Sequence, residues 1–126
     1  MKKLIFVASP YAGANAEEID ANVLFARQIC RRIFDAGAVP FAPHLLYPGI
    51  LTDANPEERA KGIEGGKRVM LGCDEFWLVL PPWRGEISTG MVAEHGFATA
   101  LNLPTKRLLT EAALVVALDQ LRAEAP

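Results

Sequence analysis

Residues 76–98 read FWLVLPPWRGEISTGMVAEHGFA, and this stretch contains the strand, turn and helix start around which the fold is organised. The run Phe76–Leu80 is continuously apolar, which is typical of a buried strand. Proline and glycine then turn the chain, and Ser88 is a good N-cap for a helix whose first turn is Thr89-Gly90-Met91. The stretch therefore predicts a strand, a loop and a helix in immediate succession.

The start of this helix is suited to binding an anion. Its first amides have no partner within the helix, and the helix dipole favours negative charge there. Glu94 follows about one and a half turns later, as a lone acid among residues that are otherwise core-like: Met91, Val92, Ala93, Phe97 and Ala98. The pattern predicts an anion site at Ser88 and a functional carboxylate at Glu94. The alternatives are a plain N-cap and a surface acid.

The other segments alternate between strand and helix patterns. Strands are predicted at Leu4–Ala8, Ala38–Ala42, Asp74–Leu80 and Lys106–Leu109, and helices at Ala16–Ala36, Pro56–Leu71, Ser88–Leu101 and Glu111–Arg122. Residues 43–48 are expected to form a loop, and the tail after Arg122 is expected to fray. This order predicts an α/β fold, a Rossmann-like or flavodoxin-like three-layer sandwich with a parallel sheet of four to five strands.

Length and composition exclude several classes. The 126 residues suit a single domain, 1–126, and are too few for two. The net charge is −2 and there is no basic block, so no nucleic acid duplex is expected as a partner. No apolar run approaches the ~20 residues of a membrane span, and no secretion signal is recognised, so a cytoplasmic protein is expected. Cys30 and Cys73 have no metal or redox spacing and are expected to be reduced, buried thiols.

Ligands of a parallel sheet bind beyond the carboxyl ends of its strands. Three loops leave those ends, and they direct Tyr11, His44, Glu86, Ser88 and Glu94 toward one crevice. Ser9, Pro10 and Gly13 belong to the first of these loops, and Trp83 in the third is a candidate for stacking on a base. The alternatives are that Tyr11 covers the sheet edge and that His44 is a hydrogen-bonded loop residue. Two histidines far apart in sequence make a metal site a weak hypothesis.

Three segments resemble the nucleoside 2-deoxyribosyltransferase-like superfamily: Ile5–Tyr11 (IFVASPY), Cys73–Trp77 (CDEFW) and Ser88–Glu94 (STGMVAE) followed by Ala98. The motif Ala42–Leu45 (APHL) looks like an uncharacterised bacterial and phage branch of it. The resemblance covers residues 4–109. A related Rossmann-like group, the nucleotide phosphoribohydrolases, is similar in placing a glutamate on the helix after a Gly-Thr turn.

The resemblance implies that Glu94 is the nucleophile that attacks the anomeric carbon and forms a covalent glycosyl-enzyme. Tyr11 matches an aromatic or polar site position in the first loop and is, with Glu94, a catalytic candidate whose hydroxyl would contact the reacting groups. Gly90 and Met91 fall in the turn that approaches the sugar. Transferases that act on nucleosides carry an aspartate six residues before the glutamate, where this sequence has Ser88. Members that hydrolyse nucleoside 5′-monophosphates place a serine there, against the phosphate.

The resemblance therefore implies hydrolysis, or base transfer, at the N-glycosidic bond of a (deoxy)nucleoside 5′-monophosphate. It implies no cofactor and no metal, and a homo-oligomer of two or more chains. Two other functions stay open: a non-catalytic nucleotide-binding sensor or interaction module on the same fold, and a free-nucleoside deoxyribosyltransferase. Glu86, His44 and Asp74 are the candidates for protonating the leaving base.

Overall fold

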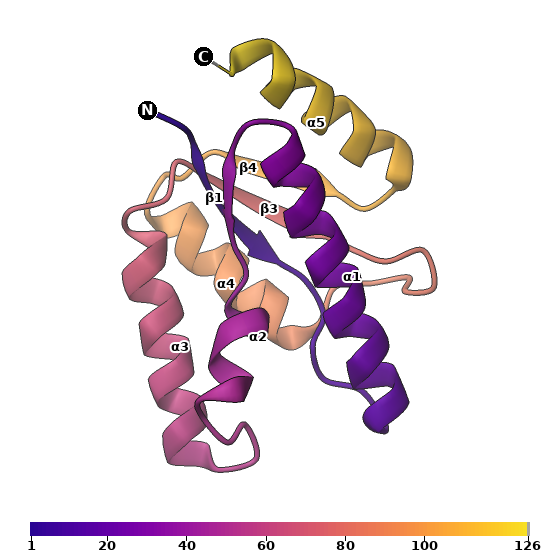
Figure 1. The fold of residues 1–126 in the computed structure, drawn as a ribbon. Coiled ribbons are helices and arrows are strands. Elements are labelled where there is room, and N and C mark those ends of the chain that lie inside the picture. The colour runs from indigo at the N-terminus through magenta and orange to yellow at the C-terminus, as the bar shows by residue number, and fades with distance from the viewer. Residues whose placement is uncertain (126) are drawn as a thin grey trace.

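The computed structural model describes residues 1–125, which form four parallel strands and the helices that cover them (Figure 1). In chain order the elements are β1 Leu4–Ala8, α1 Ala16–Asp35, β2 Val39–Phe41, α2 Pro43–Leu46, the 3₁₀ helix η1 Tyr47–Gly49, α3 Pro56–Met70, β3 Glu75–Val79, α4 Thr89–Ala100, β4 Thr105–Leu108 and α5 Glu111–Glu124. The sheet order is β2-β1-β3-β4, and every neighbouring pair is parallel. The predicted α/β fold with a parallel sheet is confirmed.

Helices cover both faces of the sheet because the central strands are apolar on both sides. On one face, Ile5, Val7, Trp77 and Val79 pack against the apolar stripes of α1 and α5. On the other face, alternate residues such as Phe6 and Phe76 pack against α3 and α4. Figure 1 shows α1 and α5 on the near side of the sheet and α4 behind it. From β1 the chain adds β2 on one side and then β3 and β4 on the other, so the direction of strand addition reverses between β1 and β3. Ligands bind at such a point in open α/β sheets.

Two predictions about local structure were wrong. Residues 43–48 do not form a plain loop: Pro43 begins the short helix α2, and η1 follows at once. Proline favours the first position of a helix because its fixed φ angle is already helical. The tail does not fray after Arg122, since α5 continues to Glu124, whose carboxylate Oε2 lies 2.6 Å from Lys3 Nζ.

The glycines of α3 permit a close contact and do not break the helix. The helix begins at Pro56 as predicted, and its N-cap Asn55 accepts hydrogen bonds from the amides of Glu57 and Glu58. A Cβ atom at Gly65 would lie 2.9 Å from the Tyr47 hydroxyl, so only glycine lets the η1 segment pack this closely on α3. This contact fixes the η1 segment on α3 beside the carboxyl end of the sheet.

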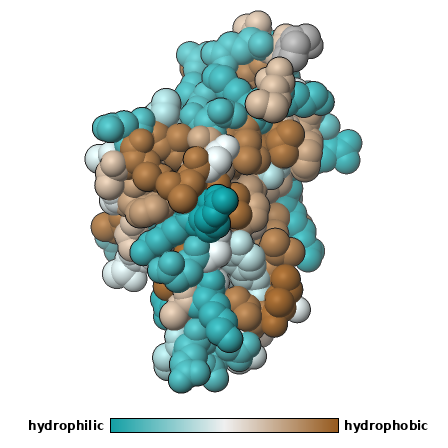
Figure 2. Space-filling view, turned by 90° about the vertical axis from the view of Figure 1, so that its left-hand side faces the viewer, coloured by the Kyte–Doolittle hydropathy of each residue, from teal (hydrophilic) through white to brown (hydrophobic). Residues whose placement is uncertain are grey.

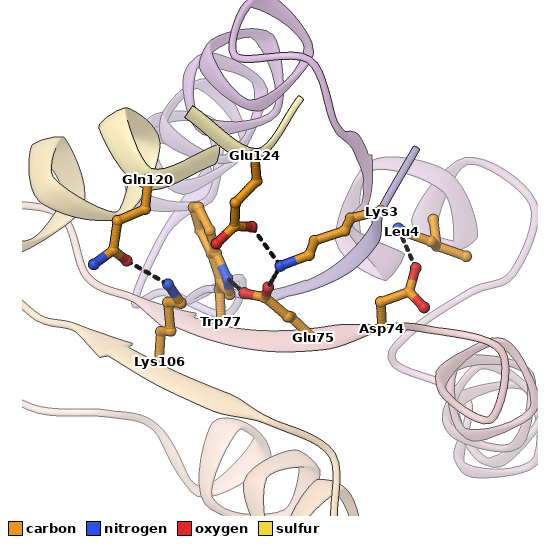
Figure 3. A network of polar contacts seen from close by, with 8 residues as sticks. All are labelled: Lys3, Leu4, Asp74, Glu75, Trp77, Lys106, Gln120 and Glu124. Carbon is orange, nitrogen blue, oxygen red and sulfur yellow. Dashed lines mark hydrogen bonds and ion pairs between the residues drawn. The ribbon is translucent and has the colours of Figure 1, made fainter. Parts of the chain in front are cut away.

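A polar network closes the opposite, amino-terminal end of the sheet (Figure 3). The Glu75 side chain is buried and accepts hydrogen bonds from Lys3 Nζ (2.5 Å) and Trp77 Nε1 (2.9 Å). Asp74 accepts a hydrogen bond from the Leu4 amide (2.8 Å). These contacts join the start of the chain to β3. Asp74 therefore has a structural role, and it lies at the amino-terminal end of β3, away from the carboxyl ends of the strands.

The part of the chain that the structure describes contains no helix long and apolar enough to cross a membrane. Within the same residues, no three His, Cys, Asp or Glu side chains are grouped so that they could hold a metal ion. Cys30 and Cys73 are free thiols, and burial raises the pKa of each to about 11. Their thiols are therefore protonated at neutral pH and unreactive as nucleophiles.

Candidate functional site

A cavity of about 570 Å³ opens between α3 and α4 at the carboxyl end of the sheet. Figure 1 shows the two helices diverging toward this end, with α2 in front of the gap. The space-filling view onto the α3 side shows apolar side chains gathered next to hydrophilic ones (Figure 2). The volume falls within the range of small-molecule sites. The floor and walls include Phe6, Ile63, Met70 and Phe97, together with polar residues from the surrounding loops.

The N-terminus of α4 forms one end of the cavity. Ser88 caps the helix, and its Oγ accepts a hydrogen bond from the Met91 amide (3.2 Å). The amides of Thr89 and Gly90 have no partner within the helix, and both residues line the cavity. Arg84 lines it as well and forms no ion pair within residues 1–125. The cavity lining therefore includes free amides and a hydroxyl at the α4 N-terminus, and one cation from the loop that precedes this helix.

Glu94 lies on the same helix at the edge of its buried face. Met91 and Ala98 pack against the sheet, and Glu94 is three residues from Met91, or about 60° around the helix. The side chain is half-buried, and its Oε1 atom is buried without a hydrogen-bond partner in the described chain. Burial raises the pKa of Glu94 from 4.5 to about 7. A buried acceptor without a partner is rare and marks a site that a ligand can complete.

An aromatic pair forms a further wall. The rings of Tyr11 and His44 stack with centroids 5.1 Å apart and an interplanar angle of 25°. Burial lowers the pKa of His44; the negative charge of Asp53 opposes this shift and the positive charge of Arg59 adds to it. All four side chains line the cavity. His44 is accordingly neutral at pH 7 and offers one donor and one acceptor nitrogen.

The structure brings half of the predicted site residues to the cavity. Those that line it are Tyr11, His44, Ser88, Thr89, Gly90 and Glu94. Those that do not are Ser9, Pro10, Gly13, Trp83, Glu86 and Met91. The three loops predicted to meet at one crevice therefore do meet there, although each loop directs some of its side chains elsewhere.

The residues that the structure does not bring to the cavity have other surroundings. Met91 is buried in the core, as the first-turn residue that packs on the sheet. Trp83 is exposed and makes an edge contact with Phe25, which belongs to the core on the other face of the sheet. Glu86 is exposed, and Gly13 lies against the side chain of Glu18.

The remaining two lie at the end of β1. Ser9 and Pro10 are both buried, and Ser9 Oγ has no hydrogen-bond partner within the described residues.

Sequence reasoning missed a group of polar lining residues: Tyr47, Asp53, Glu58, Arg59, Lys67 and Arg84. Most of them lie on η1, on α3 or between the two, a region for which the sequence predicted a loop and a helix but no part of the site. The glycines of α3 were the available signal, since Gly62 and Gly66 are spaced by four residues and both line the cavity. A glycine stripe of this kind shows which face of a helix is approached closely.

Comparison with known proteins gives a family and a fold. A family model described as "Domain of unknown function (DUF7768)" matches residues 3–108. A solved 2-deoxyribosyltransferase from the psychrotolerant bacterium Bacillus psychrosaccharolyticus aligns with a TM-score of 0.62 at 18% identity, covering 94% of this chain and 90% of that chain. No curated protein matches. The structural similarity shows a shared fold, so the resemblance stated from the sequence is confirmed at the level of the fold.

Proposed function

Because the chain belongs to the DUF7768 family, a domain of unknown function, we propose its function from the site: it cleaves the N-glycosidic bond of a (deoxy)nucleoside 5′-monophosphate, by hydrolysis or base transfer. The observation that carries the proposal is the buried, unpartnered Oε1 atom of Glu94 in a cavity of nucleotide size. The shared fold of the 2-deoxyribosyltransferase supports the substrate class.

The α4 N-terminus is the proposed phosphate site. The free amides of Thr89 and Gly90, the Ser88 hydroxyl and the unpaired Arg84 together suit a dianion. Ser88 can serve both roles, since its oxygen accepts from the Met91 amide while its hydroxyl proton stays free to donate. A rise of 1.5 Å per residue puts Glu94 about 6 Å along the helix from Gly90, which is on the scale of one sugar ring.

Glu94 is the proposed nucleophile. Its carboxylate attacks C1′ of the sugar, the bond from C1′ to the base nitrogen breaks, and the electron pair leaves with the base. The base takes up a proton from solvent water, and a covalent glycosyl ester of Glu94 remains. Water, or a second base, then attacks C1′ of this ester and releases the Glu94 carboxylate. A sugar phosphate forms in the first case and a new nucleotide in the second.

Of the three candidates for assisting the leaving base, His44 is the best placed, and it acts by a hydrogen bond. Glu86 is exposed outside the cavity, and Asp74 binds the Leu4 amide at the other end of β3. His44 lines the cavity, and in its neutral form one ring nitrogen can donate a hydrogen bond to the base. The Tyr11 hydroxyl is a second donor beside it.

Base release tests the proposal. The protein is incubated with each common deoxynucleoside and ribonucleoside 5′-monophosphate, and the products are separated by chromatography. The proposal expects free base and sugar phosphate in equal amounts from at least one nucleotide. Adding a second free base to the mixture distinguishes transfer from hydrolysis, since transfer yields a new nucleotide.

One observation favours a second candidate, a nucleotide-binding module without chemistry. With a pKa of about 7, Glu94 is protonated in roughly half of the free protein at neutral pH. A neutral carboxyl group donates a hydrogen bond to a ligand and does not attack it. Measurable nucleotide binding without base release from any nucleotide would favour this candidate.

Changing Ser88 tests the phosphate site. Ser88→Asp keeps a good N-cap for α4 but adds a negative charge where the phosphate is proposed to bind. We expect KM for the monophosphate to rise at least about 30-fold, corresponding to about 2 kcal/mol. KM for the free nucleoside should change by less than about threefold, and both are measured by steady-state base release.

Ser88→Thr is the matched control, because threonine caps a helix and retains a hydroxyl donor. It should keep the preference for nucleotide over nucleoside. An equal effect of Ser88→Asp on both substrates would place the phosphate elsewhere in the cavity.

A further inference from the structure

Asn22 is the one polar side chain among the buried residues of α1. Only 2% of it is exposed, and the other buried residues of this helix are Phe25, Ala26, Ile29 and Ile33. Burying an amide group costs free energy unless its hydrogen bonds are satisfied. A leucine would suit the apolar pattern of the helix, so packing in the core does not explain why an amide side chain occupies this position.

The Asn22 amide donates to the loop between β1 and α1. Its Nδ2 lies 3.0 Å from the Tyr11 carbonyl oxygen and 3.4 Å from the Ala12 carbonyl oxygen. Both residues line the cavity, and neither carbonyl accepts a backbone hydrogen bond within residues 1–125. The two contacts therefore hold the segment of the loop that carries the Tyr11 ring.

The rest of this loop is fixed from its own helix. Asn15 Oδ1 accepts from the Glu18 amide (2.9 Å), and Glu18 Oε2 accepts from the Ala14 amide (2.5 Å). A Cβ atom at Gly13 would lie 2.6 Å from Glu18 Cβ, so glycine lets the loop close onto the helix. The loop is thus held near the start of α1 by Asn15 and Glu18. At Tyr11, the side-chain hydrogen bond to the backbone within residues 1–125 comes from Asn22.

We propose that Asn22 is a positioning residue: its amide fixes the loop so that Tyr11 stays stacked on His44, and this stack shapes the wall of the cavity against which the substrate binds. The first half of the proposal concerns geometry and stands independently. The second half rests on the proposed function. Preorganised walls of this kind keep binding groups in their productive geometry before the ligand arrives.

The two histidines of the chain allow a direct structural test by NMR. His44 stacks on Tyr11, whereas His95 stacks on Phe76, with centroids 6.1 Å apart. In Asn22→Leu, the ring protons of His44 should move downfield as the Tyr11 ring leaves, and its pKa should rise toward 6.5 as the ring becomes more exposed. The signals of His95 should not change.

Two charged residues near His44 also shift its pKa, and the substitution at Asn22 should leave them in place. Asp53 and Arg59 act on it from the segment before α3 and from α3 itself. Neither belongs to the loop that Asn22 holds, so their contributions serve as a constant background. Ile29→Val, a mild core substitution on α1, is the control and should leave both histidines unchanged.

A double substitution tests whether Asn22 acts on His44 through Tyr11. Tyr11→Leu alone should produce the same change at His44, and adding Asn22→Leu to it should produce no more. If Asn22→Leu does not fold, Asn22→Ser replaces it, because the shorter side chain cannot reach the two carbonyls. Unchanged His44 signals in either folded variant would overturn the positioning role.

The consequence for the substrate is measured separately. In Asn22→Leu, KM for the nucleotide should rise about 10-fold because the displaced stack no longer forms the wall, and kcat should fall as well because Tyr11 and His44 are the proposed donors to the leaving base. A displaced His44 with unchanged KM would overturn the link between the stack and the substrate. If the unaltered protein releases no base, the proposed function fails, while the NMR comparison still decides the positioning role.

Discussion

Glu94→Gln is expected to lower the rate of base release from a deoxynucleoside 5′-monophosphate by about 1,000-fold or more, or about 4 kcal/mol of transition-state stabilisation. Glutamine keeps the shape of the side chain, but its neutral amide cannot attack C1′ or hold the developing positive charge of the sugar. The loss is measured as kcat in steady-state assays at pH 8. Because the phosphate site is untouched, the dissociation constant for the nucleotide should change by less than about 10-fold.

The matched control for this loss is Glu64→Gln, at an exposed position on α3 outside the cavity. It makes the same change of charge, and it should release base at the rate of the unaltered protein. If Glu94→Gln kept more than a tenth of the original kcat, Glu94 would not be the nucleophile. Base release would then come from another group in the cavity.

The second large effect is a stability that depends on pH. Glu94→Gln should unfold with the same free energy as the unaltered protein at pH 4, and should be more stable by about 1–3 kcal/mol at pH 8. In the folded protein, burial raises the pKa of Glu94 from 4.5 to about 7. Urea denaturation at a series of pH values measures the difference.

The direction of this effect follows from the two pKa values. Below pH 4.5, Glu94 is protonated in both the folded and the unfolded chain, so its burial carries no charge penalty. Between pH 4.5 and about 7, the unfolded chain releases this proton while the folded chain retains it in a site without a partner for Oε1, so the stability is lost over this range and the loss is complete above it. Glutamine never ionises and avoids the loss. Glu64→Gln should show no such pH dependence, and a pH-independent difference for Glu94→Gln would contradict the burial of the charge.

The fold was predictable because its signals are local. The continuous apolar run at β3 indicated a buried strand, and Ser88 indicated the start of α4. These residues act through caps and burial that depend on near neighbours in sequence. The α2 and η1 helices were missed because prolines such as Pro43 and Pro48 are also typical of loops. The packing of η1 against α3 depends on the contact of Tyr47 with Gly65, which is distant in sequence.

The candidate site was predictable to the level of loops but not of side chains. The rule that ligands bind beyond the carboxyl ends of strands placed Tyr11, His44, Ser88 and Glu94 at one cavity, as in the structure, but it was wrong for Glu86, which does not line it. It could not show that Trp83 lies on the other face of the sheet, or that Arg59 reaches the cavity from α3. These placements depend on the path of each loop in space. The expected cytoplasmic location and the expected homo-oligomer remain predictions.

The measurement that tests the central claim most directly is kcat/KM for base release as a function of pH. If ionised Glu94 is the nucleophile, kcat/KM rises about 10-fold per pH unit below pH 7 and levels off above it, because this ratio reports the ionisation of the free enzyme. The substrate phosphate also ionises, near pH 6. The pH profile of the residual activity of Glu94→Gln contains this ionisation without that of Glu94, so comparing the two profiles separates them. A ratio that stayed level or fell between pH 6 and pH 8 would contradict the account, because the neutral carboxyl group would then be the active form.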